Sequence, residues 1–313
     1  MNNDVFVVLN EYQYWVSCAI VKKNGIDNPV FIIMGRWSPI RCEHSVYQVA
    51  FTDMRNGKLQ KLLKLLVNNC PKIRANSIYI PSTLDPYVSK IARALRPQHI
   101  SVFDEGGGAV YSFMPPKRWF EPLVLLGWVG RVWGEGRNID YVFSPNPELF
   151  SDKLTKPIVD ISKEMREVAD ELYGPMLDEI SRNKIKDVIV LTQPYPADYL
   201  SGHGNGNEVL FNFAAEKWEE VNIKAHPREL PANRDSGKFT ALPKSIQNIP
   251  IQAIALKFEI TAIVSNCSSA LLNIAKISGR DIVSYSLIKR VEETRLTKPF
   301  LAAASKVENL FFG

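Results

Sequence analysis

The sequence predicts an α/β protein made of two domains of similar size, each built around a mostly parallel sheet. Its 313 residues, 46% of them hydrophobic and 23% charged, form an ordinary globular composition whose length suits two domains of roughly 150 residues. Short apolar, β-rich runs alternate with helical patterns in both halves of the chain. Such alternation is typical of parallel strands joined by crossover helices, so we expect two Rossmann-like domains facing each other across a cleft.

In the first half, apolar runs predict strands, and amphipathic patterns between them predict helices. The second of these helices has candidate N-cap residues at Ser82 and Asp85. The expected strands are residues 5–9, 30–34, 77–80 and 99–103, and the expected helices are residues 59–67 and 85–95.

A change in composition and periodicity predicts the domain boundary. Residues 143–160 (FSPNPELFSDKLTKPIVD) contain three prolines and little periodicity, which is typical of a linker. We therefore expect an N-terminal domain over residues 1–150 and a C-terminal domain over residues 160–313. After a long helix beginning near residue 161, the expected strands are residues 187–191, 221–225, 260–264 and 281–285, and the expected helices are residues 207–218, 249–258 and 269–277.

Composition excludes several classes of protein and cofactor. The net charge of +5 comes without a dense Lys/Arg block, so we expect no nucleic-acid partner. The four cysteines, at positions 18, 42, 70 and 267, lack the spacing of a zinc site and fit a reducing cytoplasm. There is no signal-peptide pattern and no run of about 18 apolar residues, so we expect a cytoplasmic protein. No metal-ligand constellation and no cofactor motif is visible, so we expect neither.

The first segment with chemical potential is Asp104-Glu105-Gly106, which begins a run of three glycines directly after an apolar strand. Ligands of α/β sheets bind at the carboxyl ends of the strands, and glycines allow a ligand or a second backbone to come close. The pair of carboxylates is therefore a candidate catalytic site at the end of this strand. The alternative is an acidic turn that caps the next helix.

The second segment is Lys224-Ala225-His226-Pro227-Arg228, at the end of a strand in the second half. Proline favours an extended backbone at the preceding histidine. A histidine between two cations suits a phosphate leaving group. The alternative is a solvated surface turn.

The third segment, residues 265–269, joins a strand to an apolar helix, and serine there can cap the helix or, with the helix amides, bind an anion. A further strand ends near Gln193 and is followed by a glycine-rich loop that carries His203. We expect this loop to be flexible and to lie near the cleft, with His203 and Gln193 as further candidate donor contacts. Cys267 is most simply a small buried residue.

The segment from Lys117 to Trp133 holds three of the six tryptophans, with basic residues at both ends. Aromatic and cationic groups on one helix could lie on an anionic membrane surface, at the inner face of the plasma membrane. Glu121, Pro122 and two glycines favour the alternative, which is packing between the domains.

Taken in order, three short motifs resemble those of bacterial sialyltransferases, the lipooligosaccharide sialyltransferases and capsule polysialyltransferases. These motifs are Asp104-Glu105-Gly106, His226-Pro227 and Ser268-Ser269. The resemblance implies a GT-B fold, in which the N-terminal domain binds the acceptor and the C-terminal domain binds CMP-sialic acid.

The resemblance also implies a role for each motif residue. Asp104 would act as general base with Glu105 and Gly106 beside it, His226 would contact the leaving phosphate as general acid, and Ser268 and Ser269 would bind the same phosphate. Relatives hold the ribose with a glutamate that follows an Ile/Leu-Pro pair. Here Gln252 occupies that position after Ile249-Pro250, which makes Glu259 a candidate substitute; Lys224 and Arg228 are further candidate donor contacts.

The function implied is an inverting, metal-independent transfer of sialic acid from CMP-sialic acid to a hydroxyl of lipopolysaccharide, lipooligosaccharide or capsule. The alternatives are a GT-B transferase that uses CMP-linked Kdo, legionaminic acid or another sugar nucleotide, and a non-catalytic two-lobed binding protein. A dehydrogenase is excluded because no G-x-G-x-x-G follows a first strand.

Overall fold

The computed structural model describes residues 3–35, 37–49, 73–83, 85–106, 134, 139–150, 154–180, 184–193, 206–226, 237–266, 268–287 and 297–312. Among these residues, those up to Val168 form one compact unit and those from Ala169 onward form a second. Each unit is described by itself below, as unit 1 and unit 2.

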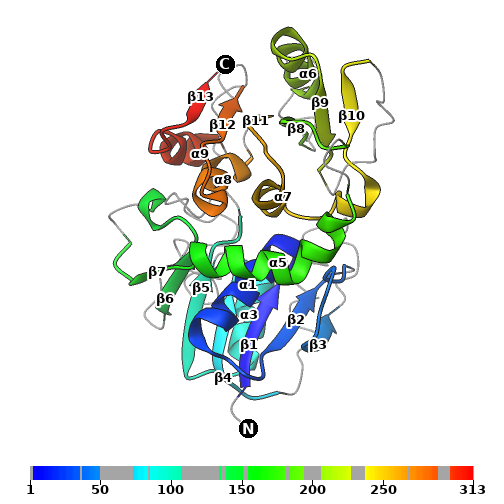
Figure 1. Ribbon diagram of the computed structural model, residues 1–313. Coiled ribbons are helices and arrows are strands. Elements are labelled where there is room, and N and C mark those ends of the chain that lie inside the picture. Colours follow the sequence, from blue (N-terminus) through cyan, green and yellow to red (C-terminus); the bar gives the residue numbers. More distant parts are fainter. Residues whose placement is uncertain are drawn as a thin grey trace, which may run out of the picture. The chain divides into compact units, whose positions relative to one another are not determined.

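Unit 1 is built on a parallel sheet of seven strands in the order β3-β2-β1-β4-β5-β6-β7 (Figure 1). The strands are β1 (Asn3–Val8), β2 (Val30–Met34), β3 (Ser45–Val49), β4 (Ala75–Ile80), β5 (His99–Phe103), β6 (Ile139–Ser144) and β7 (Ile158–Asp160). Its described helices are α1 (Glu11–Asn24), α3 (Pro86–Ala94), the 3₁₀ turn η3 (Pro147–Leu149) and α5 (Ser162–Asp178), within which the boundary between the two units falls.

Unit 2 holds a parallel sheet of six strands in the order β10-β9-β8-β11-β12-β13. The strands are β8 (Val188–Leu191), β9 (Val221–Lys224), β10 (Phe239–Ala241), β11 (Ala262–Ser265), β12 (Val283–Ser286) and β13 (Leu310–Phe312). The helices are α6 (Gly206–Lys217), the 3₁₀ turn η6 (Lys244–Ile246), α7 (Ile251–Lys257), α8 (Ala270–Ser278) and α9 (Thr297–Ala304).

Both sheets follow the Rossmann strand order. Counted within each unit, the strands run 3-2-1-4-5-6, and unit 1 adds a seventh strand at its far edge. The order reverses between the first and fourth strands, β1 and β4 in unit 1 and β8 and β11 in unit 2. At such a reversal the crossovers leave on opposite faces, which opens a ligand-binding crevice at the carboxyl ends of the strands. The predicted α/β class with two parallel sheets is confirmed.

Helix α1 was not predicted, and its burial explains why. Eight consecutive residues, Gln13 to Ile20, are buried, so the helix has no polar face to reveal its period. Its ends carry ordinary signals: the Asn10 side chain accepts a hydrogen bond from Gln13 N at 3.0 Å, and Gly25 ends the helix at φ +59°. The indole Nε1–H of Trp15 donates to the carbonyl of Met165 in α5 at 2.9 Å, so α5 covers part of α1.

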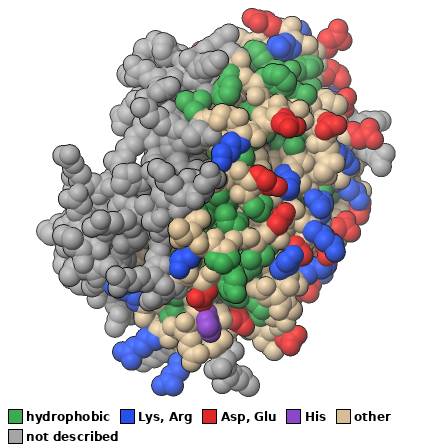
Figure 2. Space-filling view, turned by 90° about the vertical axis from the view of Figure 1, so that its left-hand side faces the viewer, with side chains coloured by type: hydrophobic (Ala, Val, Ile, Leu, Met, Phe, Trp, Pro, Cys, Tyr) green, Lys and Arg blue, Asp and Glu red, His purple; other side chains and the backbone are tan. Residues whose placement is uncertain are grey.

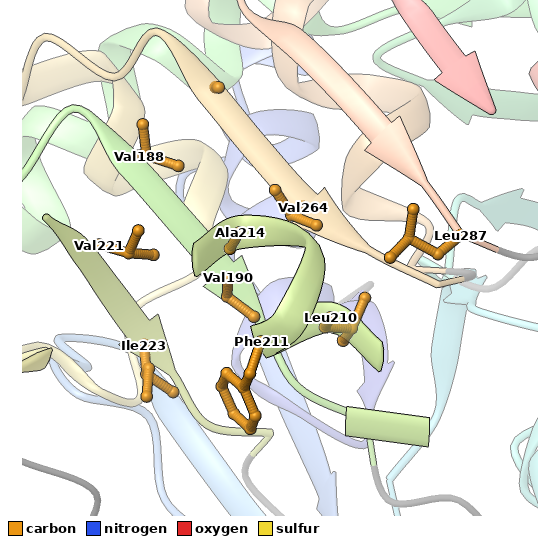
Figure 3. Packing of buried hydrophobic residues seen from close by; sticks show 10 residues of the cluster. Val188, Val190, Leu210, Phe211, Ala214, Val221, Ile223, Val264 and Leu287 are labelled. Carbon is orange, nitrogen blue, oxygen red and sulfur yellow. The ribbon is translucent and has the colours of Figure 1, made fainter. Parts of the chain in front are cut away.

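The core of unit 2 lies where α6 packs on the sheet. In Figure 3, Ala214 and Phe211 of α6 lie near Val190 of β8 and Ile223 of β9, and Leu210 lies on the side of Leu287. Burying aliphatic side chains contributes about 1.5–3 kcal/mol each. The buried members of this cluster are Val188, Val190, Leu210, Phe211, Ala214, Val221, Ile223, Ala262, Val264 and Leu287.

Most predicted elements in the described residues are present within about three residues of their expected ends. Asp85, not Ser82, is the N-cap of α3, and it accepts hydrogen bonds from Tyr87 N at 2.8 Å and Val88 N at 3.0 Å. The predicted helix over residues 59–67 lies outside the described residues. The segment predicted as a linker, residues 143–160, is not one throughout, since it holds the end of β6 and all of β7. The three prolines, Pro145, Pro147 and Pro157, lie outside both strands, so none of them removes a donor from the sheet.

On the face shown in Figure 2, Lys and Arg side chains are interspersed with Asp and Glu side chains, as a net charge of +5 leads one to expect. Within the described part of the chain, no helix combines the length and the apolar character that a membrane crossing requires.

Candidate functional site

The acidic motif of unit 1 follows β5 at the carboxyl edge of the sheet. The Asp104 side chain is fully buried, and its two carboxylate oxygens accept different hydrogen bonds. Oδ1 accepts from Gly106 N at 2.7 Å, and Oδ2 accepts from the Ser144 hydroxyl at 3.4 Å. The Ser144 hydroxyl in turn accepts from Asn146 N at 3.1 Å, which links the ends of β5 and β6. The position of Asp104 is therefore fixed by the backbone on both sides of it.

Gly106 is required by this turn for two reasons. Its φ of +75° is in the left-handed region that L side chains rarely adopt. A Cβ atom there would lie 2.8 Å from Cδ1 and 3.0 Å from Cε1 of Tyr12, in the first turn of α1. The glycine thus lets the loop after β5 approach the helix that follows β1.

Three carboxyl groups, those of Asp85, Asp104 and Glu105, lie close enough together to interact electrostatically. Burial, followed by the negative charges of Asp104 and Asp85, raises the pKa of Glu105 to about 8. Burial also raises the pKa of Asp85, although the amides of Val88 and Tyr87 act in the opposite direction. Glu105 therefore holds its proton at neutral pH and releases it in the mildly alkaline range. Paired acids with separated pKa values are typical of sites that transfer protons.

Carboxylates are common along the whole carboxyl edge of sheet 1. Besides these three, Glu11 begins α1, and its Oε2 accepts a hydrogen bond from Ile40 N at 3.2 Å. Glu148 lies in the turn after β6, and Asp160 ends β7 and accepts from Ser162 N at 2.7 Å. Unit 1 therefore offers proton acceptors at the edge where ligands of parallel sheets bind.

In unit 2, His226 and the two serines follow strands on either side of β8. His226 comes two residues after β9, and its backbone N–H donates to the Thr192 hydroxyl at 3.2 Å, just after β8. Ser268 follows β11 by three residues. Because strands are spaced about 4.8 Å apart, the ends of β9 and β11, which flank β8, lie about 10 Å apart. The structure thus places His226 and the serine pair at the same edge of sheet 2.

The serine pair begins α8. Ser268 Oγ accepts a hydrogen bond from Ala270 N at 3.3 Å, so Ser268 supplies the capping bond that the sequence suggested. Ser269 occupies the N-cap position, and both residues are half-buried. The first three amides of α8, those of Ala270, Leu271 and Leu272, already donate to the two serines. The hydroxyls of Ser268 and Ser269 are therefore the candidate donors at the carboxyl edge of sheet 2.

Three further candidate donor contacts lie at the same edge. Lys224 is the last residue of β9, only 8% exposed, and its Nζ donates to the carbonyl of Gln247. Gln252 is buried in the first turn of α7. Gln193 follows β8, where its N–H donates to Asn207 Oδ1 at 3.2 Å and its carbonyl accepts from Asn207 Nδ2 at 3.3 Å.

Glu259 does not belong to this group. It is exposed and precedes β11, whereas Gln252 lies at the start of α7. In parallel α/β units a helix runs antiparallel to the strands, so the two ends of α7 lie at opposite edges of the sheet. Glu259 therefore lies at the amino edge of sheet 2, at the opposite edge from Gln252.

The two edges of sheet 2 differ in charge. Among the described residues that follow its strands, residues 192–193, 225–226, 242–250, 266, 268–269 and 287, there is no Asp or Glu, while Lys244 and His226 are present. Carboxylates are found at the opposite edge, just before the strands, at Asp187, Glu219, Glu220, Glu259, Asp281 and Glu308. The carboxyl edge of unit 2 is thus suited to binding an anion. The carboxyl edge of unit 1 instead supplies groups that can accept a proton.

Several candidates from the sequence lie outside the described residues. They are Pro227, Arg228, His203, Cys267 and the segment from Lys117 to Trp133. In the portion of the chain that is described, no three His, Cys, Asp or Glu side chains are grouped so as to hold a metal ion.

Sequence reasoning missed four residues of the site. Asp85 was considered only as a cap, and Tyr12, Ser144 and Thr192 were not considered. A signal was available for all four, because each lies within about five residues of the carboxyl end of a strand. In a parallel sheet this position places them at one edge.

The two Rossmann-like units define a class of protein, that of the GT-B fold. UGT73P12 from Glycyrrhiza uralensis, in complex with glycyrrhetinic acid 3-O-monoglucuronide, is 11% identical, with a TM-score of 0.53 over 99% of this chain and 81% of its own. UDP-GlcNAc 2-epimerase from Neisseria meningitidis, bound to UDP-GlcNAc, is 10% identical, with a TM-score of 0.53 over 97% and 86% of the chains. MnaA from S. aureus with UDP is 10% identical, with a TM-score of 0.51 over 92% and 79%. At these identities the likeness establishes the fold.

The family follows from the sequence itself. The profile of the alpha-2,8-polysialyltransferase (POLYST) family matches residues 58–286, and this chain belongs to that family. It is accordingly a sialyltransferase of the GT-B fold, an enzyme that acts on a nucleotide-sugar donor and a glycan acceptor. A search of curated proteins finds no match.

Replacing Gly106 by alanine should destabilise unit 1 and reduce activity. The left-handed φ costs roughly 1–2 kcal/mol for a side chain, and the contact with Tyr12 adds about 1–3 kcal/mol. The matched control is Gly25→Ala, where φ is +59° but no atom lies within 4 Å of the added Cβ. Urea denaturation of both variants measures the difference. Equal losses would mean that the Tyr12 ring moves aside at no cost.

The raised pKa of Glu105 should make the stability of unit 1 fall with rising pH. The folded chain holds this proton up to about pH 8, whereas the unfolded chain releases it near the ordinary value of 4.5. Folding therefore takes up a proton between these values, so stability is lost as pH rises from about 4.5 to 8 and then levels off.

Glu105→Gln should remove this fall in the free energy of unfolding with rising pH, which we expect to be on the order of 1–3 kcal/mol. Thermal and urea denaturation at pH 5, 6.5 and 8 test this, with Glu148→Gln, an exposed carboxylate at the same edge, as the control. A wild-type decline that persists unchanged in Glu105→Gln would show that another group holds the proton.

Proposed function

We propose that this enzyme transfers sialic acid from CMP-sialic acid to a hydroxyl of a glycan acceptor, with inversion at the anomeric carbon and without a metal ion. The observation that carries the proposal is the contrast between the two carboxyl edges. The edge of unit 1 presents carboxylates. That of unit 2 presents a buried lysine, a histidine and hydroxyls, with no carboxylate among the described residues that follow its strands. The family match supports sialic acid as the transferred sugar.

In unit 1, we assign the general base to the carboxylate pair and, within it, to Asp104. A sugar hydroxyl is a weak nucleophile, so a positioned carboxylate must take its proton during attack on the anomeric carbon. The hydrogen bonds from Gly106 N and the Ser144 hydroxyl hold the Asp104 carboxyl group in a fixed orientation. Glu105, protonated at neutral pH, leaves a single negative charge on the pair, which limits repulsion of an anionic substrate.

In unit 2, His226, Ser268 and Ser269 would hold the phosphate of the donor. CMP departs as a phosphate monoester while the sialyl group passes through an oxocarbenium-like transition state. Hydrogen bonds aimed at the developing charge are worth most at that point. Hydroxyls and an imidazole can supply them, so no step requires a metal ion. A single displacement by the acceptor hydroxyl inverts the anomeric centre.

A donor panel tests the proposal directly. We expect hydrolysis and transfer with CMP-sialic acid, and none with CMP-Kdo, CMP-legionaminic acid or UDP-GlcNAc. Mass spectrometry of products from lactose and from oligosialic acid would identify the acceptor and the number of residues added. Activity should survive EDTA. Preference for another CMP-linked sugar would support the alternative donor, and a requirement for Mg²⁺ that is restored by adding the ion back would contradict the metal-free mechanism.

Asp104→Asn should lower the transfer rate by roughly 10²–10⁴, the usual loss for a general base. It should leave CMP affinity unchanged, because the proposed donor site belongs to unit 2. Glu105→Gln is the matched variant and should lose less than about tenfold. Steady-state kinetics with calorimetric CMP binding measures both effects. If Glu105→Gln loses activity and Asp104→Asn keeps more than half of it, the base is Glu105.

A further inference from the structure

Lys224 is a buried cation with a neutral partner. Its side chain is only 8% exposed, and its Nζ donates to the carbonyl of Gln247, between η6 and α7. An ammonium group has three N–H donors and one positive charge. The carbonyl accepts one hydrogen and carries no formal charge, so the charge of Lys224 is left uncompensated by this contact. Buried cations are normally paired, because an uncompensated charge in a low dielectric is costly.

The described groups nearest to Lys224 along the chain carry no negative charge. His226 lies two residues beyond the end of β9, and Lys244 in η6 is exposed. The neighbouring strand β8 is followed by the neutral residues Thr192 and Gln193, and α7 begins near Gln252. Burial lowers the pKa of Lys224 to about 8, and no carboxylate in the described part of the chain counters it. In the free enzyme the lysine is thus close to losing its proton at physiological pH.

We propose that Lys224 takes up a proton when the phosphate of the donor binds at the carboxyl edge of unit 2, so that donor binding and the charging of a buried lysine are coupled. This rests on the proposed function, which places an anion at that edge. The phosphodiester of CMP-sialic acid carries one negative charge and the monoester CMP carries two at pH 8. Either charge, close to the buried ammonium, favours the charged form of the lysine, as any opposite charge does within about 4–6 Å. The coupling is reciprocal, so the proton tightens binding as much as the anion raises the affinity for the proton.

The size of the effect follows from the fraction of charged lysine in the free enzyme. With a pKa of about 8, Lys224 is about nine-tenths charged at pH 7 and about one-tenth charged at pH 9. If only the charged form binds tightly, the apparent affinity falls with that fraction. We expect CMP affinity to weaken about tenfold between pH 7 and pH 9, with uptake of about half a proton per molecule at pH 8.

Isothermal titration calorimetry with CMP measures both quantities. Titrations at pH 7, 8 and 9, each in two buffers of different ionisation enthalpy, give the affinity and the number of protons taken up. The second phosphate pKa of a nucleotide is about 6, and an ordinary imidazole titrates near 6.5, so neither contributes much at pH 8–9. His226→Gln, measured in the same way at pH 8–9, should retain the proton uptake even though it weakens binding.

Variants at position 224 separate coupling from a structural role. Lys224→Met should abolish proton uptake and weaken CMP binding at pH 7 by at least tenfold. Lys224→Arg cannot lose its charge in this range, so CMP affinity should become independent of pH between 7 and 9. The control is Lys238→Met, which removes an exposed lysine at the opposite edge of sheet 2 and should leave the uptake and its pH profile unchanged.

The outcomes distinguish this inference from the proposed function. If CMP binds the wild-type enzyme without proton uptake at pH 8 and with a constant affinity from pH 7 to 9, the inference is wrong and the donor site stands. The inference also fails if Lys224→Met retains the uptake. If neither CMP nor CMP-sialic acid binds or is hydrolysed, the proposed function itself fails. The pH series on the wild type separates these outcomes even if a variant does not fold.

Discussion

The structure depends on the parallel orientation of every strand pair in both sheets. Parallel pairing sends all carboxyl ends of a sheet to one edge, so the loops after successive strands meet there although they are far apart in sequence. Asp85, Asp104 and Ser144 are separated by many residues, yet they follow the neighbouring strands β4, β5 and β6. The same rule places Thr192, His226 and Ser268 after β8, β9 and β11. Each unit therefore concentrates its chemistry at one edge, and no strand among the described residues departs from the pattern.

The carboxyl edges of the two sheets differ in how their charged groups are accommodated. In unit 1, carboxyl groups are crowded, and the crowding is tolerated because one of them, Glu105, stays protonated while Asp104 accepts hydrogen bonds from Gly106 and Ser144. In unit 2, a lysine is buried against a carbonyl, and the described carboxylates that flank the strands lie at the opposite edge. Both arrangements cost stability in the free protein, and such costs are common at functional sites, where the substrate or the proton later relieves them.

The sequence predicted element bounds best where apolar runs were continuous and ended at a polar residue or glycine. Strands β2 and β5 have their predicted bounds, because continuous apolar or β-branched runs end at polar or glycine residues. Helix α1 was missed because it is buried on all sides, and β3 because four of its five residues are exposed and follow no apolar pattern. Strands β7, β10 and β13 are only three residues long, too short for any period to be recognised.

The motif residues could be placed from the sequence, but their environments could not. That Asp104, His226 and Ser268 follow strands was evident from the alternation of elements. The burial of Lys224 and its contact with the carbonyl of Gln247 depend instead on tertiary packing that no local pattern records.

The hydrogen bond between the Trp15 indole and the Met165 carbonyl joins residues that are 150 positions apart. Strand β7 and the start of α5 complete unit 1, so its sheet and its buried helix are closed by the last residues of the unit. Contacts of such long range are slow to form, since loop closure must be completed before they stabilise anything. During synthesis, the first five strands will have left the ribosome well before the segment that covers α1 is available. Until then α1 exposes an indole and aliphatic side chains to solvent, which makes the half-made chain a natural substrate for chaperones.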